Sequence, residues 1–141
     1  IATKTMRQKF VPQLKKIVDL VHKADKLFLL HSSGKMYQLM DDLISIGVDG
    51  KHSYEDKIFP VEKAYQQFAD RIAILGGVDV HLLASGTEEQ VRMRTRQILE
   101  ACAPGGRYVL GTGNSVVNYM PITNYLSMLD EGRRWNEENW K

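Results

Sequence analysis

The amino-acid sequence predicts an α/β fold in which parallel strands alternate with helices. Short apolar runs of strand length recur along the chain, stretches of helical periodicity separate them, and glycine-containing turns mark the junctions. Alternation of this kind favours parallel pairing with right-handed crossovers. Two architectures fit the pattern: a small doubly wound sheet and half of a (β/α)8 barrel. Periodicity alone does not choose between them.

The first elements are a helix, a strand and a second helix. Apolar residues at helical spacing predict an amphipathic helix over residues 5–24, and the apolar run over 26–31 predicts a buried parallel strand. Ser33 is a candidate N-cap for the next helix. That helix carries an apolar stripe that starts at Met36, and Gly47 ends it.

The later elements repeat this unit. Strands are expected at 48–52, 72–78 and 108–110, and apolar stripes predict helices over 61–68, 91–102 and 122–129. Thr87 and Gln90 form a capping box, in which each side chain satisfies a free backbone N–H at the start of a helix. Arg92, Arg94 and Arg96 have a spacing of two, which puts them on different helix faces, and we expect them to be solvated.

Composition fits one globular domain over residues 1–141. The net charge of +2, from 19 basic and 17 acidic residues, indicates neither nucleic acid nor a membrane surface as a partner. No apolar run approaches the roughly 18 residues of a membrane span. The single cysteine, Cys102, lies on an apolar stripe and has no disulfide partner, which favours an inert thiol and a cytoplasmic location. Because the chain opens with Ile1, we expect a fragment of a longer protein.

Both architectures place functional groups at the carboxyl ends of the strands. The candidates there are His31, His52, Asp79 and Asn114. His31 is either a ligand or donor in a barrel mouth or a histidine that caps a strand, and Asp79 is either a site carboxylate or a turn cap. The loop 111–115 could hold a phosphate or carboxylate with its backbone N–H groups, or it could be a tight turn whose glycines adopt positive φ.

Three stretches carry a resemblance to a known family. They are Leu30–Gly34 with Leu39–Leu43 and Ile46–Gly50, Asp70–Asp79 with Leu82–Thr87, and Pro104–Ser115 with Asn124–Leu126. In this order and spacing they resemble the uroporphyrinogen decarboxylase superfamily, which also contains corrinoid-linked methyltransferases that move a methyl group from methylcobalamin to a thiol. The resemblance covers residues 10–130.

The resemblance implies that the chain is the C-terminal half of a TIM (β/α)8 barrel, with four parallel strands alternating with helices. The family's aspartate and arginine contacts to a porphyrinogen belong to the other half and are not carried over. Side chains that point into the barrel, among them Leu29, Ile74 and Val109 or their neighbours, would then be exposed to water unless another chain segment covered them. The expected partner is the missing N-terminal half of the barrel or a second copy in a homodimer.

The resemblance also assigns site residues. The methyltransferase branch has a zinc site, for which His31 matches the histidine, but Ser33 stands at the first cysteine and Asn114 near the second. Asn114 also lies near the histidine of the decarboxylase branch. We therefore expect His31 and Asn114 to be catalytic and no tightly bound metal or cofactor. The residues expected to bind the substrate, a corrinoid or a tetrapyrrole, are His52, Asp79, Gly111, Gly113 and Ser115.

The implied activity is either that of a carboxy-lyase of porphyrin biosynthesis or that of a corrinoid-linked methyltransferase working with a corrinoid protein. The local sequence of residues 31–34 favours the methyltransferase branch, whereas the missing cysteines disfavour zinc–thiolate chemistry. A methyl acceptor other than a thiol would reconcile the two. A fragment that lacks half of its site is expected to be inactive alone. The alternative is a non-catalytic binding or assembly module that kept the fold.

Overall fold

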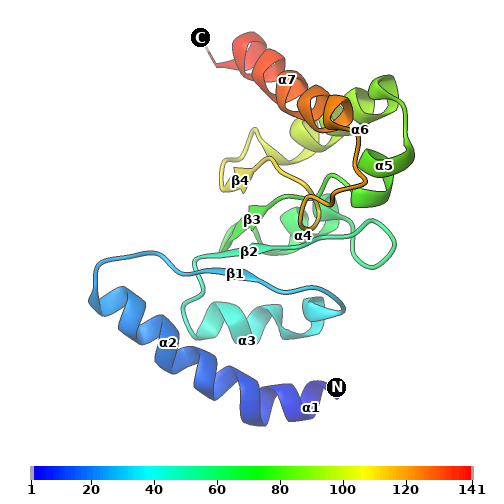
Figure 1. The fold of residues 1–141 in the computed structure, drawn as a ribbon. Helices are drawn as coiled ribbons and strands as arrows, with labels where there is room; N and C mark the ends of the chain where they lie inside the picture. The colour runs from blue at the N-terminus through cyan, green and yellow to red at the C-terminus, as the bar shows by residue number, and fades with distance from the viewer. Residues whose placement is uncertain (1, 141) are drawn as a thin grey trace.

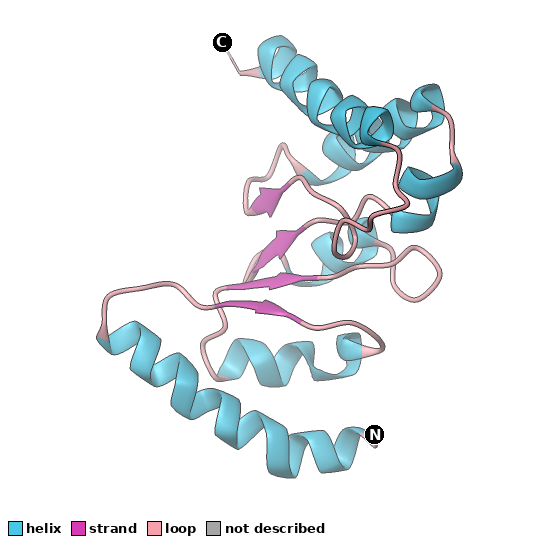
Figure 2. Cartoon of the chain, in the orientation of Figure 1, coloured by secondary structure: helices cyan, strands magenta, loops and turns pink. Residues whose placement is uncertain are grey.

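The computed structural model describes residues 2–140, which form one four-stranded parallel sheet with helices packed along it (Figure 1). The strands are β1 (Leu29–His31), β2 (Gly50–His52), β3 (Ala73–Leu75) and β4 (Tyr108–Val109). Helix α1 (Thr3–Thr5) continues through a π-helical turn (Met6–Phe10) into α2 (Val11–Lys23). A 3-10 turn (Met36–Leu39) leads into α3 (Met40–Ser45). The remaining helices are α4 (Val61–Phe68), α5 (Val80–Ser85), α6 (Glu88–Cys102) and α7 (Ile122–Asn139). Figure 2 shows helices between successive strands and after the last one, which confirms the predicted class.

The strand order decides between the two architectures. The sheet order is β1-β2-β3-β4, and every neighbouring pair is parallel. Each crossover therefore advances in the same direction, and right-handed crossovers that advance together place their helices on the same face. A doubly wound sheet instead reverses its order at one point and has helices on both faces. The chain is therefore half of a (β/α)8 barrel.

The register of the strands separates a helix-covered face from an open face. Leu30, Lys51 and Ile74 are in register on the covered face and are all buried. Leu29 and Val109 lie on the opposite face, where they are 55% and 53% exposed. This open face corresponds to the interior of a complete barrel. Ile74 faces the core and its neighbour Leu75 lies on the open face instead, because successive residues of a strand point to opposite faces.

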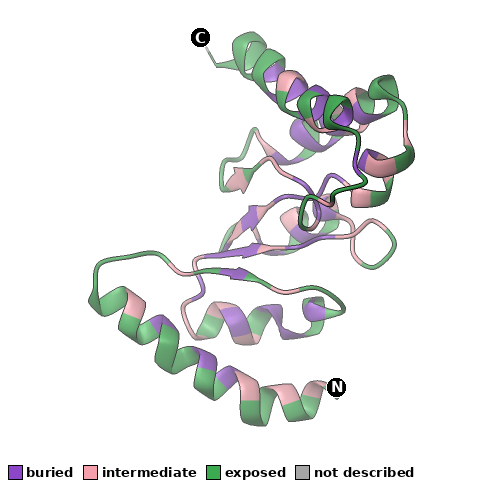
Figure 3. Cartoon of the chain, in the orientation of Figure 1, coloured by how far each residue is buried: buried purple, intermediate pink, exposed green. Residues whose placement is uncertain are grey.

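The hydrophobic core lies between the covered face and the helices, as the buried segments in Figure 3 show. Its largest fully buried side chains include Met40, Leu43, Ile72, Leu83, Ile98 and Met128. Cys102 is buried in this core, and burial raises the pKa of its thiol to about 12, as expected for an inert packed cysteine. In residues 2–140, no helix combines the length and the apolar character that a membrane crossing requires.

Helix α6 begins with the predicted capping box. The Thr87 hydroxyl accepts a hydrogen bond from the Gln90 N–H at 3.2 Å, and the Thr87 N–H donates to Gln90 Oε1 at 2.9 Å. Two of the N–H groups that a helix start leaves unpaired are thereby satisfied. The box fixes the first residue of α6.

The expectation of a solvated face for the α6 arginines is wrong. Arg92 and Arg96, one helical turn apart, both pair with acidic side chains of α7. Arg94 faces away from α7 and pairs with Asp56 at 2.8 Å and with Glu62. Its side chain is only 19% exposed, so the Arg94 ion-pair cluster is largely shielded from water. The cluster joins α6 to α4 and to the loop after β2.

Helix α7 buries a different face from the one that its apolar pattern predicts. Ile122, Leu126 and Leu129 are 64%, 52% and 43% exposed. The buried side carries Met128 and Trp135 together with polar groups, among them Asn124 and Glu131. The Asn124 amide donates to two backbone carbonyl groups near the end of α5, at 3.0 and 2.8 Å. Much of the apolar stripe of α7 is thus exposed to solvent.

Candidate functional site

The carboxyl ends of β1 and β2 bring two histidines together on the open face of the sheet. His31 ends β1, His52 ends β2, and the two residues are in register. Their Nδ1 atoms lie 2.7 Å apart. His52 Nε2 lies 2.9 Å from the carbonyl oxygen of Thr112, in the loop after β4. The pair therefore links the ends of β1, β2 and β4.

Hydroxyl and amide groups from the same three loops lie beside the histidines. Ser33 Oγ is 3.2 Å from Ser53 Oγ, and the Asn114 amide donates to Ser33 Oγ at 3.2 Å. The Ser115 N–H donates to Asn114 Oδ1 at 2.8 Å, which orients that amide. Ser33 is therefore not the expected N-cap, and the 3-10 turn after it has no side-chain cap. We call His31, Ser33, His52, Ser53 and Asn114 the polar cluster.

The environment of His52 favours its uncharged form. Its pKa is lowered first by burial and then by the nearby His31 and Lys51, against the opposing effect of the hydrogen bond to the Thr112 carbonyl. An imidazole whose ordinary pKa is about 6.5 is then neutral at physiological pH. His52 accordingly has one ring nitrogen that donates and one that accepts.

Two N–H groups of the glycine-rich loop after β4 already donate hydrogen bonds within the protein. The Gly113 N–H donates to the Val78 carbonyl at 2.6 Å, and the Ser115 N–H binds a side chain of the same loop. An anion would have to compete with both bonds. The interpretation as a positive-φ turn is wrong, because neither Gly111 nor Gly113 has a positive φ. Gly113 is needed for close packing instead, since a Cβ there would lie 2.4 Å from the Tyr54 carbonyl oxygen.

Asp79 lies apart from the two histidines. Its carboxylate accepts the His81 N–H at 2.7 Å and caps α5, a helix too short for its periodicity to predict. The other carboxylate oxygen is 3.4 Å from the Asp56 N. Asp79 nevertheless lines a pocket of about 450 Å³ together with Asn114 and Ser115. The site thus has two parts, the polar cluster and this adjoining pocket.

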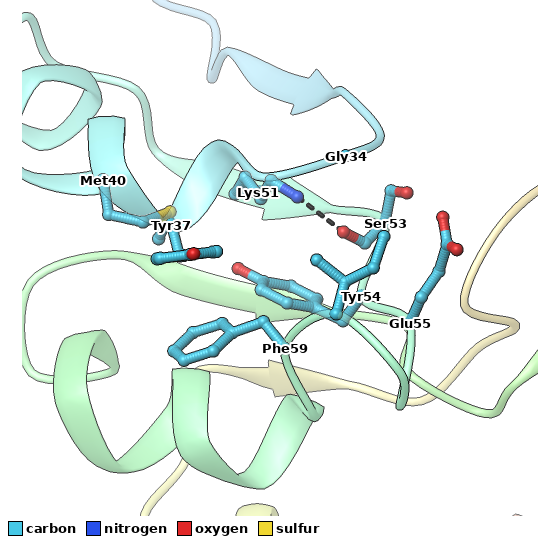
Figure 4. A pocket seen from close by; sticks show the side chains of 9 residues that line it. Gly34, Tyr37, Met40, Lys51, Ser53, Tyr54, Glu55 and Phe59 are labelled. Atoms are coloured by element: carbon cyan, nitrogen blue, oxygen red, sulfur yellow. Dashed lines mark hydrogen bonds between the residues drawn. The ribbon is translucent and has the colours of Figure 1, made fainter. Parts of the chain in front are cut away.

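Sequence reasoning missed Lys51 and Tyr54, which enter one small pocket on the helix-covered side of β2 (Figure 4). They are 2% and 4% exposed. The Lys51 ammonium donates to the Ser53 carbonyl at 2.5 Å and lies 4.4 Å from the centre of the Tyr54 ring, whereas the Tyr54 hydroxyl has no partner among residues 2–140. The alternation of side chains along a strand could have indicated the burial of Lys51. If His52 lies on the open face, the preceding residue of the same strand must point to the covered face.

Replacing Lys51 with methionine is expected to stabilise the fold near neutral pH, and the gain should fade as the pH rises. Burial lowers the pKa of Lys51 from its ordinary 10.5 to about 8, with Glu55 opposing this effect. Below pH 8 the folded state therefore bears a desolvation cost of about 3 kcal/mol, at about 1.4 kcal/mol per pKa unit. Between pH 8 and pH 10.5 Lys51 is protonated in the unfolded state but largely neutral in the folded state. The parent protein therefore gains stability as the pH rises through this range.

Urea denaturation of the parent and of Lys51→Met between about pH 7 and pH 9.5 measures this effect. Loss of the hydrogen bond to Ser53 costs about 1 kcal/mol, so a net gain of about 2 kcal/mol is expected at pH 7. Lys16→Met, at an exposed position of α2, is the control and should show no such pH dependence. A gain that stays constant across the range would contradict the prediction.

The donor set of the polar cluster does not fit zinc. Protein zinc sites take three or four ligands from imidazole, thiolate and carboxylate groups. The two histidines turn their Nδ1 atoms toward each other, and beside them stand the Ser33 hydroxyl and the Asn114 amide. Within residues 2–140, no group of three or more histidine, cysteine, aspartate and glutamate side chains could hold a metal ion.

Elemental analysis of chelator-washed protein is therefore expected to find much less than one zinc per chain. The double variant Ser33→Cys, Asn114→Cys is the matched comparison, because it places two thiols next to His31, at positions whose present side chains are 3.2 Å apart. This variant should retain zinc through the wash. Stoichiometric zinc in the unmodified protein would refute the prediction.

Comparisons with known proteins agree with this fold. Residues 1–135 match the sequence profile of the family described as Uroporphyrinogen decarboxylase (URO-D). A solved structure of a methyltransferase from Methanosarcina mazei superposes with a TM-score of 0.76 at 20% sequence identity, over 96% of this chain and 38% of that one. No curated protein sequence matches significantly. The chain therefore spans little more than a third of the structure that it resembles.

Proposed function

Because the chain belongs to the uroporphyrinogen decarboxylase family, we propose that the barrel of which it forms half is a corrinoid-linked methyltransferase. One solved structure that it resembles is that of a methyltransferase. The observation that carries the proposal is the composition of the polar cluster. Imidazole, hydroxyl and amide groups meet there, with no guanidinium, ammonium or carboxylate among them. Such a cluster suits the transfer of a small apolar group.

The arginines of this chain do not support binding of a tetrapyrrole with many carboxylates. Carboxylates are recognised best by the forked guanidinium of arginine. Within residues 2–140, the arginine side chains bind acidic side chains or backbone carbonyls: Arg7 binds Asp42, Arg71 Asp41, Arg92 Asp130, Arg94 Glu62, Arg96 Glu131, Arg107 the Asp70 carbonyl, Arg133 Glu137 and Arg134 Asp130. None of these partners belongs to the polar cluster. This half of the barrel therefore supplies no guanidinium to a polycarboxylate substrate.

The methyl acceptor that we propose is not a zinc-bound thiol. Ser33 and Asn114 stand where two thiolates would be needed to hold a zinc ion that activates a second thiol. An acceptor that bears an O–H or N–H group suits the cluster better. It can donate to an imidazole nitrogen or to an oxygen of the cluster.

The test is to incubate the complete protein with methylcob(III)alamin and separate panels of alcohols, phenols, amines and thiols. The corrinoid spectrum reports demethylation, and mass spectrometry identifies the methylated acceptor. His31→Gln is expected to lower turnover by about 10²–10⁴-fold, the range for loss of a proton-transfer group. His22→Gln is the matched control, because His22 pairs with Asp49 away from the cluster. If thiols were the only acceptors to be methylated, and His31→Gln left that turnover unchanged, the proposal would be wrong.

Two other outcomes point to other functions. Decarboxylation of uroporphyrinogen by the complete protein, above an enzyme-free control, would favour the carboxy-lyase of porphyrin biosynthesis. Neither activity, in protein shown to be folded, would favour the non-catalytic assembly module. The present chain alone is expected to show no decarboxylation, because catalysis requires several positioned groups and half of a barrel supplies only part of them.

We also propose that the open face is covered by the other strands of an eight-stranded barrel, or by a second copy of the chain. The match to 38% of a longer chain and the exposed Leu29 and Val109 support this proposal. A corrinoid protein is the proposed donor partner, because a methyltransferase of this kind must receive its methyl group from a corrinoid. The free, buried Cys102 favours a reducing, cytoplasmic location.

A further inference from the structure

The hydrogen bond between His52 and Thr112 fixes the proton on one nitrogen of His52. A backbone carbonyl can only accept a hydrogen bond. His52 Nε2 lies 2.9 Å from the Thr112 carbonyl oxygen, so Nε2 must carry the hydrogen and donate. Because the surroundings of His52 favour its neutral form, its other nitrogen, Nδ1, carries a lone pair.

The proton of His31 follows from that of His52. The two Nδ1 atoms are 2.7 Å apart, and two lone pairs cannot face each other at that distance without a proton between them. His31 Nδ1 must therefore donate to His52 Nδ1. In a neutral His31 the remaining nitrogen, Nε2, then bears a lone pair. His31 is exposed on the open face, and its Nε2 has no hydrogen-bond partner among residues 2–140.

Gly76 gives independent support, because its lack of a side chain leaves the space that the hydrogen bond between His52 and Thr112 occupies. Gly76 lies directly after β3 with φ +85°. A Cβ at this position would lie 2.4 Å from the Thr112 carbonyl oxygen and 2.8 Å from both Cδ2 and Nε2 of His52. Both partners of the hydrogen bond would be pushed away. Glycine is thus required at the contact that sets the protonation of the histidine pair.

We propose that His52, the Thr112 carbonyl and Gly76 act together as a positioning device that holds His31 as its Nδ1–H tautomer and leaves Nε2 as the proton acceptor of the site. The inference deepens the proposed function: the group that Nε2 receives is the O–H or N–H of the methyl acceptor. His52, expected from the sequence to bind substrate, is thereby assigned a positioning role. Its ring acts on the substrate only through His31.

The nitrogen-15 NMR spectrum of the histidines tests this inference without any activity. In ¹⁵N-histidine-labelled complete protein at about pH 8, above the ordinary histidine pKa, the protonated and unprotonated ring nitrogens have clearly different shifts. The expected spectrum of His31, assigned by its loss in His31→Gln, shows a protonated Nδ1 and an unprotonated Nε2. The opposite tautomer, or an equal mixture of the two, would overturn the inference.

Two variants at His52 separate positioning from bulk structure. In His52→Gln the amide oxygen can accept from His31 Nδ1 while the amide NH₂ donates to Thr112, so the His31 tautomer should be retained. His52→Leu offers neither group, and His31 should revert to a mixture of tautomers. Equal His31 spectra in the two variants would count against the device. Because the parent spectrum already decides the tautomer, a folding failure in His52→Leu does not leave the inference untested.

The results also separate this inference from the proposed function. An Nδ1–H tautomer in a protein that transfers no methyl group would remove the proposed function and leave the device in place. Methyl transfer by a protein whose His31 carries its hydrogen on Nε2 would support the proposed function and remove the positioning device. In the methyl-transfer assay, His52→Leu should lower kcat with little change in KM, and His52→Gln should restore most of the loss.

Discussion

Arg94→Ala is expected to lower the free energy of unfolding by about 2–4 kcal/mol, near the low end of the range for breaking a buried ion pair. Arg94 binds Glu62 and Asp56, and the three side chains are 19%, 23% and 34% exposed. Burial tends to raise the pKa of Glu62, but the hydrogen bond to Arg94 lowers it overall. Without Arg94, two carboxylates would face each other in a poorly hydrated space, and the loop after β2 would lose its tie to α6.

Chemical denaturation of purified variants measures this loss. Arg133→Ala is the control, because Arg133 also binds two acidic side chains but is 61% exposed. Exposed ion pairs contribute about 0–1 kcal/mol, so this variant should unfold close to the parent. Arg94→Lys should be intermediate, since lysine keeps the charge and loses the forked geometry. Equal destabilisation by Arg94→Ala and Arg133→Ala would show that shielding has no role.

The chain expressed alone is expected to associate at micromolar concentration instead of remaining a monomer. Leu29 and Val109 expose an apolar strip on the open face, and each large aliphatic side chain left in water forgoes about 1.5–3 kcal/mol of burial. The first and last long helices also expose apolar side chains: Leu20 of α2 is 65% exposed and Ile122 of α7 is 64% exposed. An interface that covers these groups should exceed about 1,000 Å².

Light scattering on the eluting peak of a sizing column gives the mass directly. Leu29→Asp should shift the chain toward the monomer, because a carboxylate cannot be buried unpaired in such an interface. Met93→Asp is the matched control: Met93 is 55% exposed on α6, among the helices that cover the other face. A stable monomer of the unmodified chain would contradict the expectation that the open face of the sheet must be covered by another chain.

The sequence was sufficient for the architecture and for part of the site. Periodicity located every strand, although all four strands are shorter than the ranges expected for them. It failed for α7, because its polar Asn124 and Glu131 are buried by specific partners that a hydropathy pattern cannot anticipate. It also failed for Lys51, whose burial depends on the direction of one side chain in a three-residue strand.

Within the site, strand ends pointed to His31, His52 and Asn114, and the structure brings these residues together. The contacts of Ser53 and Gly76 could not be inferred, because they depend on how separate loops approach one another. Asp79 illustrates the opposite case. Its position after a strand suggested either a site carboxylate or a turn cap, and its carboxylate caps the first turn of a helix that was not expected.

The polar cluster also sets when the site can exist during folding. Strands that pair only with their neighbours can form one after another, yet the hydrogen bond from His52 to Thr112 spans 60 residues and that from Asn114 to Ser33 spans 81. Contacts that close such long loops carry the largest entropy cost and tend to form late. They are also the contacts that a brief undocking of the β4 loop would break while β1, β2 and β3 stay paired. The proton-accepting form of His31 would then last only as long as that loop stays docked.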